Sequence, residues 1–471
     1  MKKTLLSLSF LLGLGLQGYS QVFTPQNSNL APDYLFDDIQ VINPDVVWGL
    51  AGLLPTGPGQ LSNYTYVRTT NGGTSWQGGL VTAAGLTNFG IGNIVAANAT
   101  TAWAAVYPSA AGGPSAILKT TNGGLNWTRQ TTATFAGGDA FPNLVHFFDE
   151  NNGVCQGDPN GIAGGSSVKF FEIYTTNNGG TTWTRVPRTP ALTTPAGEYS
   201  VVNQYCTVGN TIWFLTGYET GNTTNRVRVF RSTDRGVTWS ALGETPFLEQ
   251  ASGIAFTDAN NGVVWDGPDL ASTTDGGVTW SVRPYSTPFR RAKTSAIRNS
   301  NVLVSVGADG RVPGTGPFPI ADFGVSTSRD NGATWQSIDT GTLYSAVDFL
   351  SGTVGWAAGR TTAGTGGGAI GKYTGGNILS NRNAELQKAL AVYPNPSSSG
   401  VFTVQLASGL KSGAVVRVFD VVGRQVATQE LNATAIAAKS TTVDLSREKT
   451  GIYTLELRTE AGVAQQKLVV E

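Results

Sequence analysis

Ten charged or aromatic residues are the candidates for chemistry in this 471-residue sequence, because nearly all fall in loops that are expected to face one opening. Two carboxylates at the right separation can serve as acid and base in glycoside hydrolysis. The same carboxylates, mixed with arginines and aromatic rings, can instead form a polar binding site. Taken singly, each candidate also reads as a solvated loop residue or a turn former. The candidates are Asp139, His146, Asp158, Glu198, Tyr199, Asp266, Arg290, Arg291, Tyr344 and Arg360.

Composition excludes several other kinds of site. His146 is the only histidine, so a zinc site with several histidines or a Ser-His-Asp triad is not expected. We expect no metal and no cofactor. The formal net charge is zero, which gives no support for nucleic acid as a partner. The two cysteines, Cys155 and Cys206, fall in strands expected to be neighbours, and the sequence leaves open whether they are free or paired.

One short sequence motif recurs six times between the segments that carry these candidates, so the units that it marks must position them. Its form is Ser/Thr-x-Asp/Asn-x-Gly-x-(Thr/Ser/Asn)-Trp, and we call it the repeated box. The Asp or Asn side chain can bond backbone N–H groups just ahead of it, and Gly tolerates a positive φ, so the box predicts a turn. The copies are Thr69–Trp76, Thr120–Trp127, Thr176–Trp183, Ser232–Trp239, Thr273–Trp280 and Ser328–Trp335.

A second, weaker phrase lies between the boxes and reads as an apolar strand, a polar turn and a second apolar strand. It has seven copies, and Trp48, Trp103, Trp213, Trp265 and Trp356 fall at corresponding places in the second strand. Units of about 49 residues without helical periodicity predict four short strands each, and seven such units closed in a ring predict a seven-bladed β-propeller. The copies are Leu35–Gly52, Asn93–Tyr107, Leu144–Asp158, Gln204–Gly217, Gly253–Gly267, Ser295–Gly307 and Ala346–Gly359.

The seventh unit has no box and no fourth strand of its own. Its third strand is expected at Gly371–Gly375, and the sequence then becomes polar. We therefore expect Val22–Gln26, at the other end of the propeller sequence, to complete the last blade as its outermost strand.

The repeated box resembles the Asp box of sialidases, sortilin-type receptors and photosystem II assembly-factor-like propellers. The sequence of Phe256–Trp265 followed by Thr274–Trp280 is most similar to the repeat of the assembly-factor-like group. That resemblance implies a seven-bladed propeller with BNR-like repeats, whose boxes lie away from the ligand face. It specifies the blade and no particular ligand.

Two enzyme families with such boxes remain alternatives. Sialidases carry an Arg-Ile-Pro phrase before the first box, and the only arginine there in this chain is Arg68, which abuts the box. Xyloglucanases with these boxes use two propellers, and this chain has the length for one. We therefore expect a non-catalytic propeller that binds a glycan or a protein, with an extracellular glycoside hydrolase using channel carboxylates as the alternative.

The two ends of the chain predict export. Residues 1–20 carry Lys2 and Lys3, a short apolar run and small residues before Gln21, as in a secretory signal peptide, and no later apolar stretch could span a membrane. The propeller is expected at residues 21–376, a linker at 377–387 and a small Ig-like β-sandwich at 388–471.

The last segment also resembles a known family. Its Tyr393–Pro396 phrase, Gly423-Arg424, Gly451–Tyr453 and Lys467–Val470 are similar to the type A C-terminal sorting domain of the type IX (Por) secretion system of Bacteroidetes. The resemblance implies that the type IX machinery is a partner of residues 388–471. The protein would then pass through the periplasm and be secreted or held at the outer cell surface.

Deleting residues 388–471 should retain the propeller in the periplasm of the native host, because the sorting signal would be lost. Immunoblots of periplasmic and culture fractions measure this. Normal amounts of the truncated protein outside the cell would reject the sorting role.

Overall fold

The computed structural model describes residues 22–54, 64–87, 89–108, 115–135, 141–161, 168–309, 322–360, 369–379, 384–406, 414–459 and 462–471. The expected signal peptide lies outside these residues. Tertiary contacts divide the chain into two compact units, Met1–Gly375 and Gly376–Glu471.

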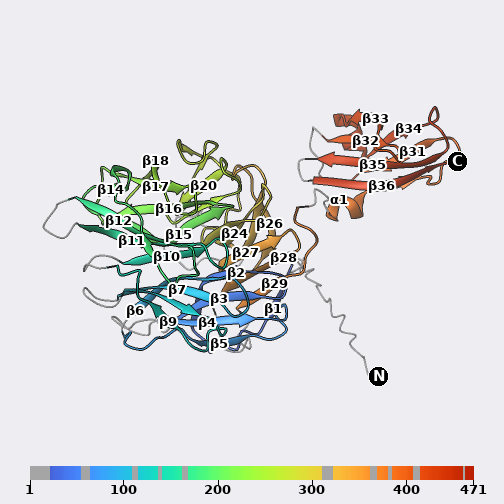
Figure 1. Cartoon of the computed structure of the whole chain (residues 1–471). Coiled ribbons are helices and arrows are strands. Elements are labelled where there is room, and N and C mark those ends of the chain that lie inside the picture. Colours follow the sequence, from blue (N-terminus) through green and yellow to red (C-terminus); the bar gives the residue numbers. More distant parts are fainter. Residues whose placement is uncertain are drawn as a thin grey trace, which may run out of the picture. The chain divides into compact units, whose positions relative to one another are not determined.

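The first unit consists, over the described residues, of seven antiparallel sheets of four strands, one of them extended by a short fifth strand. Figure 1 shows the innermost strands β2, β10, β15 and β27 near the middle of the unit, with β5, β9 and β18 toward its rim. This arrangement confirms the predicted all-β propeller. We number its blades from 1 to 7 along the chain.

The strands occupy equivalent places in each blade. The innermost are β2 (Tyr34–Val41), β6 (Phe89–Ala96), β10 (Pro142–Phe147), β15 (Glu198–Val208), β19 (Gly253–Phe256), β23 (Lys293–Ala296) and β27 (Tyr344–Ser351). The second are β3 (Val47–Leu53), β7 (Ala102–Pro108), β11 (Gly153–Gly161), β16 (Thr211–Tyr218), β20 (Gly262–Asp266), β24 (Leu303–Ala308) and β28 (Val354–Gly359).

The outer half of each blade is less buried. The third strands are β4 (Tyr64–Thr69), β8 (Ala116–Thr120), β12 (Lys169–Thr176), β17 (Arg226–Ser232), β21 (Asp269–Thr273), β25 (Phe323–Ser328) and β29 (Ile370–Tyr373). The fourth are β5 (Gln77–Leu80), β9 (Thr128–Gln130), β13 (Thr184–Arg185), β18 (Ser240–Leu248), β22 (Ser281–Val282), β26 (Gln336–Thr340) and, in blade 7, β1 (Phe23–Gln26). A 3-10 turn (Pro190–Leu192) and β14 (Thr193–Thr194) add to blade 3.

The repeated box folds identically in all six copies. In the fourth, the Ser232 hydroxyl donates to Asp234 Oδ1 at 2.8 Å, and the N–H groups of Gly236 and Thr238 donate to Ser232 Oγ and Asp234 Oδ1 at 2.8 Å each. In the fifth, bonds from the Thr279 hydroxyl and backbone N–H lower the pKa of Asp275 to about 2. The carboxylate and amide side chains of the boxes therefore form hydrogen bonds within their own turn.

A second device joins neighbouring blades. Trp103 in β7 and Lys119 in β8 face each other across the sheet, with the ammonium 5.2 Å from the ring centroid, and both donate to the carbonyl O of Gly179 in the next blade's box, at 3.2 and 2.7 Å. Trp48 with Arg68 and Trp213 with Arg231 reach the next blade in the same way, and of the equivalent pair Trp356 and Lys372 the lysine reaches it. The five second-strand tryptophans are fully buried.

The last blade is closed by β1, which confirms the expectation for Val22–Gln26. Strand β1 pairs antiparallel with β29, with Phe23 opposite Tyr373, and the two strands lie side by side in Figure 1. Phe23 is buried among aromatic rings of blade 7. Gln26 Oε1 accepts from the indole N–H of Trp356 in blade 7 and of Trp76 in blade 1, at 3.1 Å each. The strand thus ties the last blade to the first.

The two cysteines are free thiols, so the disulfide that the sequence left open does not form. Cys155 is buried in β11 of blade 3, and Cys206 is partly buried in β15 of blade 4.

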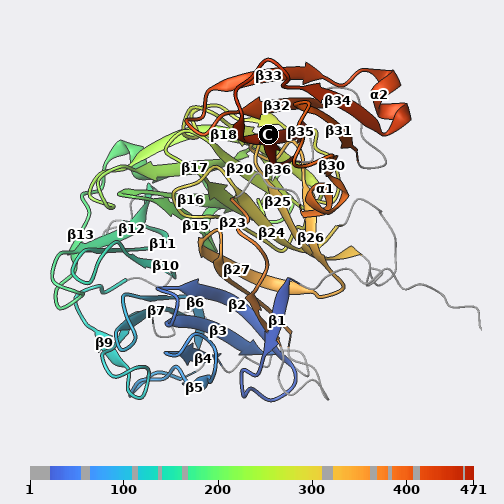
Figure 2. The same cartoon turned by 90° about the vertical axis from the view of Figure 1, so that its right-hand side faces the viewer.

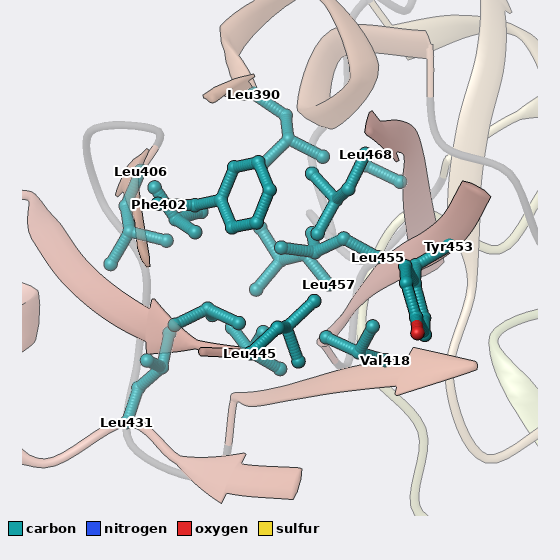
Figure 3. Packing of buried hydrophobic residues seen from close by; sticks show 14 of the residues in the cluster. Leu390, Phe402, Leu406, Val418, Leu431, Leu445, Tyr453, Leu455, Leu457 and Leu468 are labelled. Carbon is teal, nitrogen blue, oxygen red and sulfur yellow. The ribbon is translucent and has the colours of Figure 1, made fainter. Parts of the chain in front are cut away.

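The second unit packs two sheets face to face, β30–β31–β34 and β33–β32–β35–β36. Figure 3 shows the Phe402 ring at the centre of its core, among Leu390, Leu406, Leu457 and Leu468. The strands are β30 (Ala391–Tyr393), β31 (Val401–Gln405), β32 (Val415–Phe419), β33 (Gln425–Glu430), β34 (Ser440–Asp444), β35 (Gly451–Thr459) and β36 (Gly462–Val470). The predicted sandwich is confirmed.

Two short helices were not predicted, α1 (Ala384–Ala389) and α2 (Ala433–Ala438), both visible in Figure 2. The sequence predicts residues 384–387 as the end of a polar linker. Leu386 of α1 and the following Leu390 are buried in the core of the sandwich, so this part of the segment belongs to the second unit. Two leucines in a polar stretch are too weak a pattern to predict a helix.

The phrase at Tyr393–Pro396 meets the C-terminal strand. Asn395 Nδ2 donates to the carbonyl O of Lys467 at 2.6 Å, and the N–H of Val469 donates to Asn395 Oδ1 at 2.9 Å. Two motifs that lie far apart in the sequence are thus held against each other.

Phe23→Ala should lower the free energy of unfolding by about 3–5 kcal/mol, because it empties an aromatic pocket at the joint that closes the ring. Urea unfolding of the purified protein measures this. Thr24→Ala on the exposed side of the same strand is the matched control and should change little. Deleting residues 21–30 should lower the Tm markedly; an unchanged Tm would mean that β1 does not close the ring.

Candidate functional site

A cavity of about 620 Å³ lies at the centre of the propeller, lined by the innermost strands of all seven blades and by the turns that follow them; we call it the channel cavity. Those turns lie on the face that carries the repeated boxes, because the box of a blade bonds the turn of the same blade. For example, the N–H of Gly179 donates to the carbonyl O of Asn151, and that of Gly276 to Asn260, at 2.9 Å each. The channel cavity therefore reaches the box face.

The structure does not bring the ten sequence candidates together at this cavity. His146 lines it. Asp139 lies outside the described residues. The other eight are not among its lining residues, because they lie at the start of an innermost strand or near the end of a second strand, away from the box face. They are Asp158, Glu198, Tyr199, Asp266, Arg290, Arg291, Tyr344 and Arg360.

Glu198 is the most tightly held of the candidate carboxylates. Its side chain is fully buried, and it pairs with the Arg228 guanidinium through both oxygens, Oε1 accepting from Arg228 Nε at 2.8 Å. The Tyr218 hydroxyl adds a bond to Oε1 at 3.4 Å. A carboxylate enclosed in this way holds the blade together and has no oxygen left for a substrate.

Asp158 and Asp266 are also engaged with their own surroundings. Asp158 Oδ1 accepts from Asn143 Nδ2 at 2.7 Å and from the N–H of Ser200, in the next blade, at 2.9 Å. Asp266 Oδ1 accepts from the Ser252 hydroxyl at 3.1 Å, while burial raises the pKa of the Asp266 carboxyl.

The arginine and tyrosine candidates are dispersed over several contacts. Tyr344 is buried against Phe23, with ring centroids 5.6 Å apart, and burial raises its pKa. Arg360 forms an exposed ion pair with Asp33 at 2.7 Å. Arg290 is buried and donates to the carbonyl O of Asp322.

The remaining two candidates make contacts at different places. Tyr199 donates its hydroxyl to Gln250 Oε1 at 3.4 Å. The backbone carbonyl of Arg291 accepts from the Trp265 indole at 3.1 Å. As a group, the eight residues hold loops and blades in place.

Six charged residues that the sequence reading missed line the channel cavity: Asp38, Asp149, Glu150, Lys293, Arg298 and Asp348. Asp348 Oδ2 accepts from Arg298 Nη2 at 3.0 Å and from the N–H of Val41, in blade 1, at 2.7 Å. The same Arg298 nitrogen donates to the carbonyl O of Val41 at 2.7 Å. This triad joins blades 6, 7 and 1 at the cavity wall.

Asp38 and His146 have displaced pKa values. Burial raises the pKa of Asp38 to about 7, with Lys293 opposing the shift and Asp348 adding to it. Burial and the nearby Arg298 lower the pKa of His146 to about 3. Near neutral pH, Asp38 is therefore close to half-protonated and the imidazole is neutral. A sequence signal for Asp38 existed, since two adjacent carboxylates interrupt an apolar strand at Asp37 and Asp38.

Among the described residues, no group of three or more His, Cys, Asp or Glu side chains is placed to hold a metal ion. No helix in the described part of the chain is long and apolar enough to cross a membrane.

The raised pKa of Asp38 predicts a pH-dependent stability. Because its ordinary value is 3.8, the folded protein holds this proton more tightly, and stability should fall as pH rises from about 4 to about 7. Cavity water screens part of the effect, so we expect roughly 2 kcal/mol. Asp38→Asn should flatten this slope relative to wild type, and Asp45→Asn, at an exposed turn of the same blade, should not. Equal slopes in urea unfolding of wild type and Asp38→Asn would contradict the assignment.

The comparisons with known proteins concern both units. Residues 391–471 match the secretion system C-terminal sorting domain family. Comparison with curated proteins gave no match.

Similar solved structures include YCF48 bound to D1 peptide, with 18% identity, coverage of 76% of this chain and 98% of that one, and a TM-score of 0.45. They also include PorZ, a surface component of the type-IX secretion system of Porphyromonas gingivalis, with 14% identity, coverage of 91% and 58%, and a TM-score of 0.46. A third is the GH74 xyloglucanase of Xanthomonas campestris, with 10% identity, coverage of 93% and 86%, and a TM-score of 0.33. The chain combines a seven-bladed β-propeller with a secretion system C-terminal sorting domain, which marks it for export by the type IX system to the cell surface or beyond.

Proposed function

We propose that the exported propeller is a non-catalytic binding protein whose glycan or protein ligand enters the channel cavity from the box face. The observation that carries this proposal is the cavity itself. Its volume of about 620 Å³ suits a ligand site, and residues from all seven blades line it, with polar side chains from every blade except blade 2.

The engagement of the carboxylates supports binding over catalysis. Hydrolysis of a glycosidic bond needs one carboxyl as acid and a second carboxylate that is free to attack or to activate water. Asp348 is held by Arg298 and by the N–H of Val41. Glu198, Asp158 and Asp266 lie elsewhere and are bonded to their own surroundings.

One observation favours the alternative, a glycoside hydrolase. The carboxyl of Asp38 keeps its proton up to near neutral pH, beside the ion-paired Asp348 and in the same cavity. A protonated carboxyl next to an ionised one is the arrangement that a general acid requires.

Incubating the purified protein with a panel of polysaccharides, aryl glycosides and host surface proteins separates the two functions. We expect retention without release of reducing ends, and retention about tenfold weaker in Lys293→Met, which removes a charge from the cavity wall. Arg360→Ala, at an exposed ion pair that does not line the cavity, is the control and should bind normally. Release of reducing ends that disappears in Asp38→Asn would reject the binding proposal.

A further inference from the structure

A second hollow of about 230 Å³ lies on the box face between blades 3 and 4; we call it the box groove. Its walls are rich in amide and hydroxyl side chains, and they include Arg235 of the fourth box. The other polar residues that line it are Asn152, Thr175, Thr176, Asn177, Thr182, Thr184 and Asp234. Such groups pair with hydroxyls, whereas the buried centre of a protein interface is richer in apolar side chains.

Arg235 stands at a box position that elsewhere avoids large side chains. Its backbone is left-handed, with φ at 63°. The equivalent residues of the other boxes are Gly72, Gly123, Gly179, Gly276 and Asn331. Glycine adopts this conformation freely and asparagine often does, whereas arginine does so rarely. Residues in strained backbone conformations cluster at functional sites, where the side chain has a role that offsets the strain.

The guanidinium of Arg235 links the box groove to the mouth of the channel cavity. Arg235 Nη1 pairs with Asp149 Oδ2 at 2.7 Å, and Nε donates to Asn210 Oδ1 at 2.8 Å. The guanidinium carbon also lies 5.9 Å from the ring centroid of Phe148. Phe148 and Asp149 line the channel cavity, and Arg235 lines the box groove, so one side chain forms the ridge between the two hollows.

The charge of these walls selects among glycans. Five carboxylates and three cations line the two hollows together, and His146 is neutral near pH 7, so the net charge stays negative even with Asp38 partly protonated. Their net negative charge repels acidic polymers, whereas uncharged sugar hydroxyls can bond to amides, hydroxyls and the ridge guanidinium.

We propose that the channel cavity and the box groove form one continuous surface for a neutral polysaccharide chain, with Arg235 as the specificity-determining residue on the ridge that the chain crosses. This inference rests on the proposed function and narrows its ligand to one class. It also gives the box face a role in recognition.

The test compares Arg235→Gly with Asn331→Gly. Both substitutions place glycine at the same box position with a left-handed backbone, and only the first alters the ridge. Xyloglucan, laminarin and amylose serve as neutral probes, and polygalacturonate and alginate as acidic ones, in affinity electrophoresis and calorimetry with the full chain. We expect at least one neutral probe to bind and no acidic one. Arg235→Gly should weaken binding at least tenfold with an equal or higher Tm, and Asn331→Gly should leave the affinity unchanged.

Each other outcome overturns the inference. Equal affinity of wild type and Arg235→Gly would show that the chain does not cross the ridge. If Lys293→Met then still weakened binding, the proposed function would stand without the box groove. Retention of acidic probes alone, or of none of the five polymers, would reject the neutral polysaccharide as ligand, while binding of a protein at the channel cavity would leave the proposed function in place.

Discussion

The propeller depends on contacts between neighbouring blades, and in blades 2, 4 and 7 these include hydrogen bonds from the middle of the blade to the box of the next. Each blade alone is a small sheet with two apolar faces, and it is stable only when neighbours cover both. In blades 2 and 4 a buried tryptophan and a cation opposite it converge on a single glycine carbonyl, Gly179 or Gly276. In these blades the box of the neighbour is therefore a turn and an acceptor at once.

Hydrogen bonds also explain why the two faces of the propeller differ. Box and inner turn are bonded to each other, so the box face is built from tight, short turns around the mouth of the channel cavity. On the opposite side, Glu198 with Arg228 and Asp158 with Ser200 use their charges to hold loops and neighbouring blades. Charges on that side hold the scaffold, whereas Lys293, Arg298 and Arg235 line hollows that a ligand could enter, although Arg298 and Arg235 are also ion-paired.

The fold could be predicted from the sequence because its main signals are hydrogen bonds between residues close together in the chain. The box predicts its own turn, and the missing seventh box correctly assigned the first strand to the last blade. The site was not readable in this way. Bulges in the innermost strands, such as those between Phe36 and Asp38 and between Ser200 and Tyr205, change which side chains face the channel, and a period-2 pattern cannot show this. Partners from other blades, such as Arg298 for Asp348, are equally invisible, because the distance between them is fixed only by ring closure.

Closure by β1 also sets how the chain must fold. Thr24 bonds Thr374 across a sequence separation of 350 residues, so the last joint of the ring is its least local contact. Such non-local pairing is slow, because the entropy of closing a long loop precedes any gain from it. The ring cannot close before the residues near 374 have been synthesised. Until then blades 1 and 7 each leave a sheet face uncovered. The ring therefore stays open until nearly all of the propeller sequence has been synthesised.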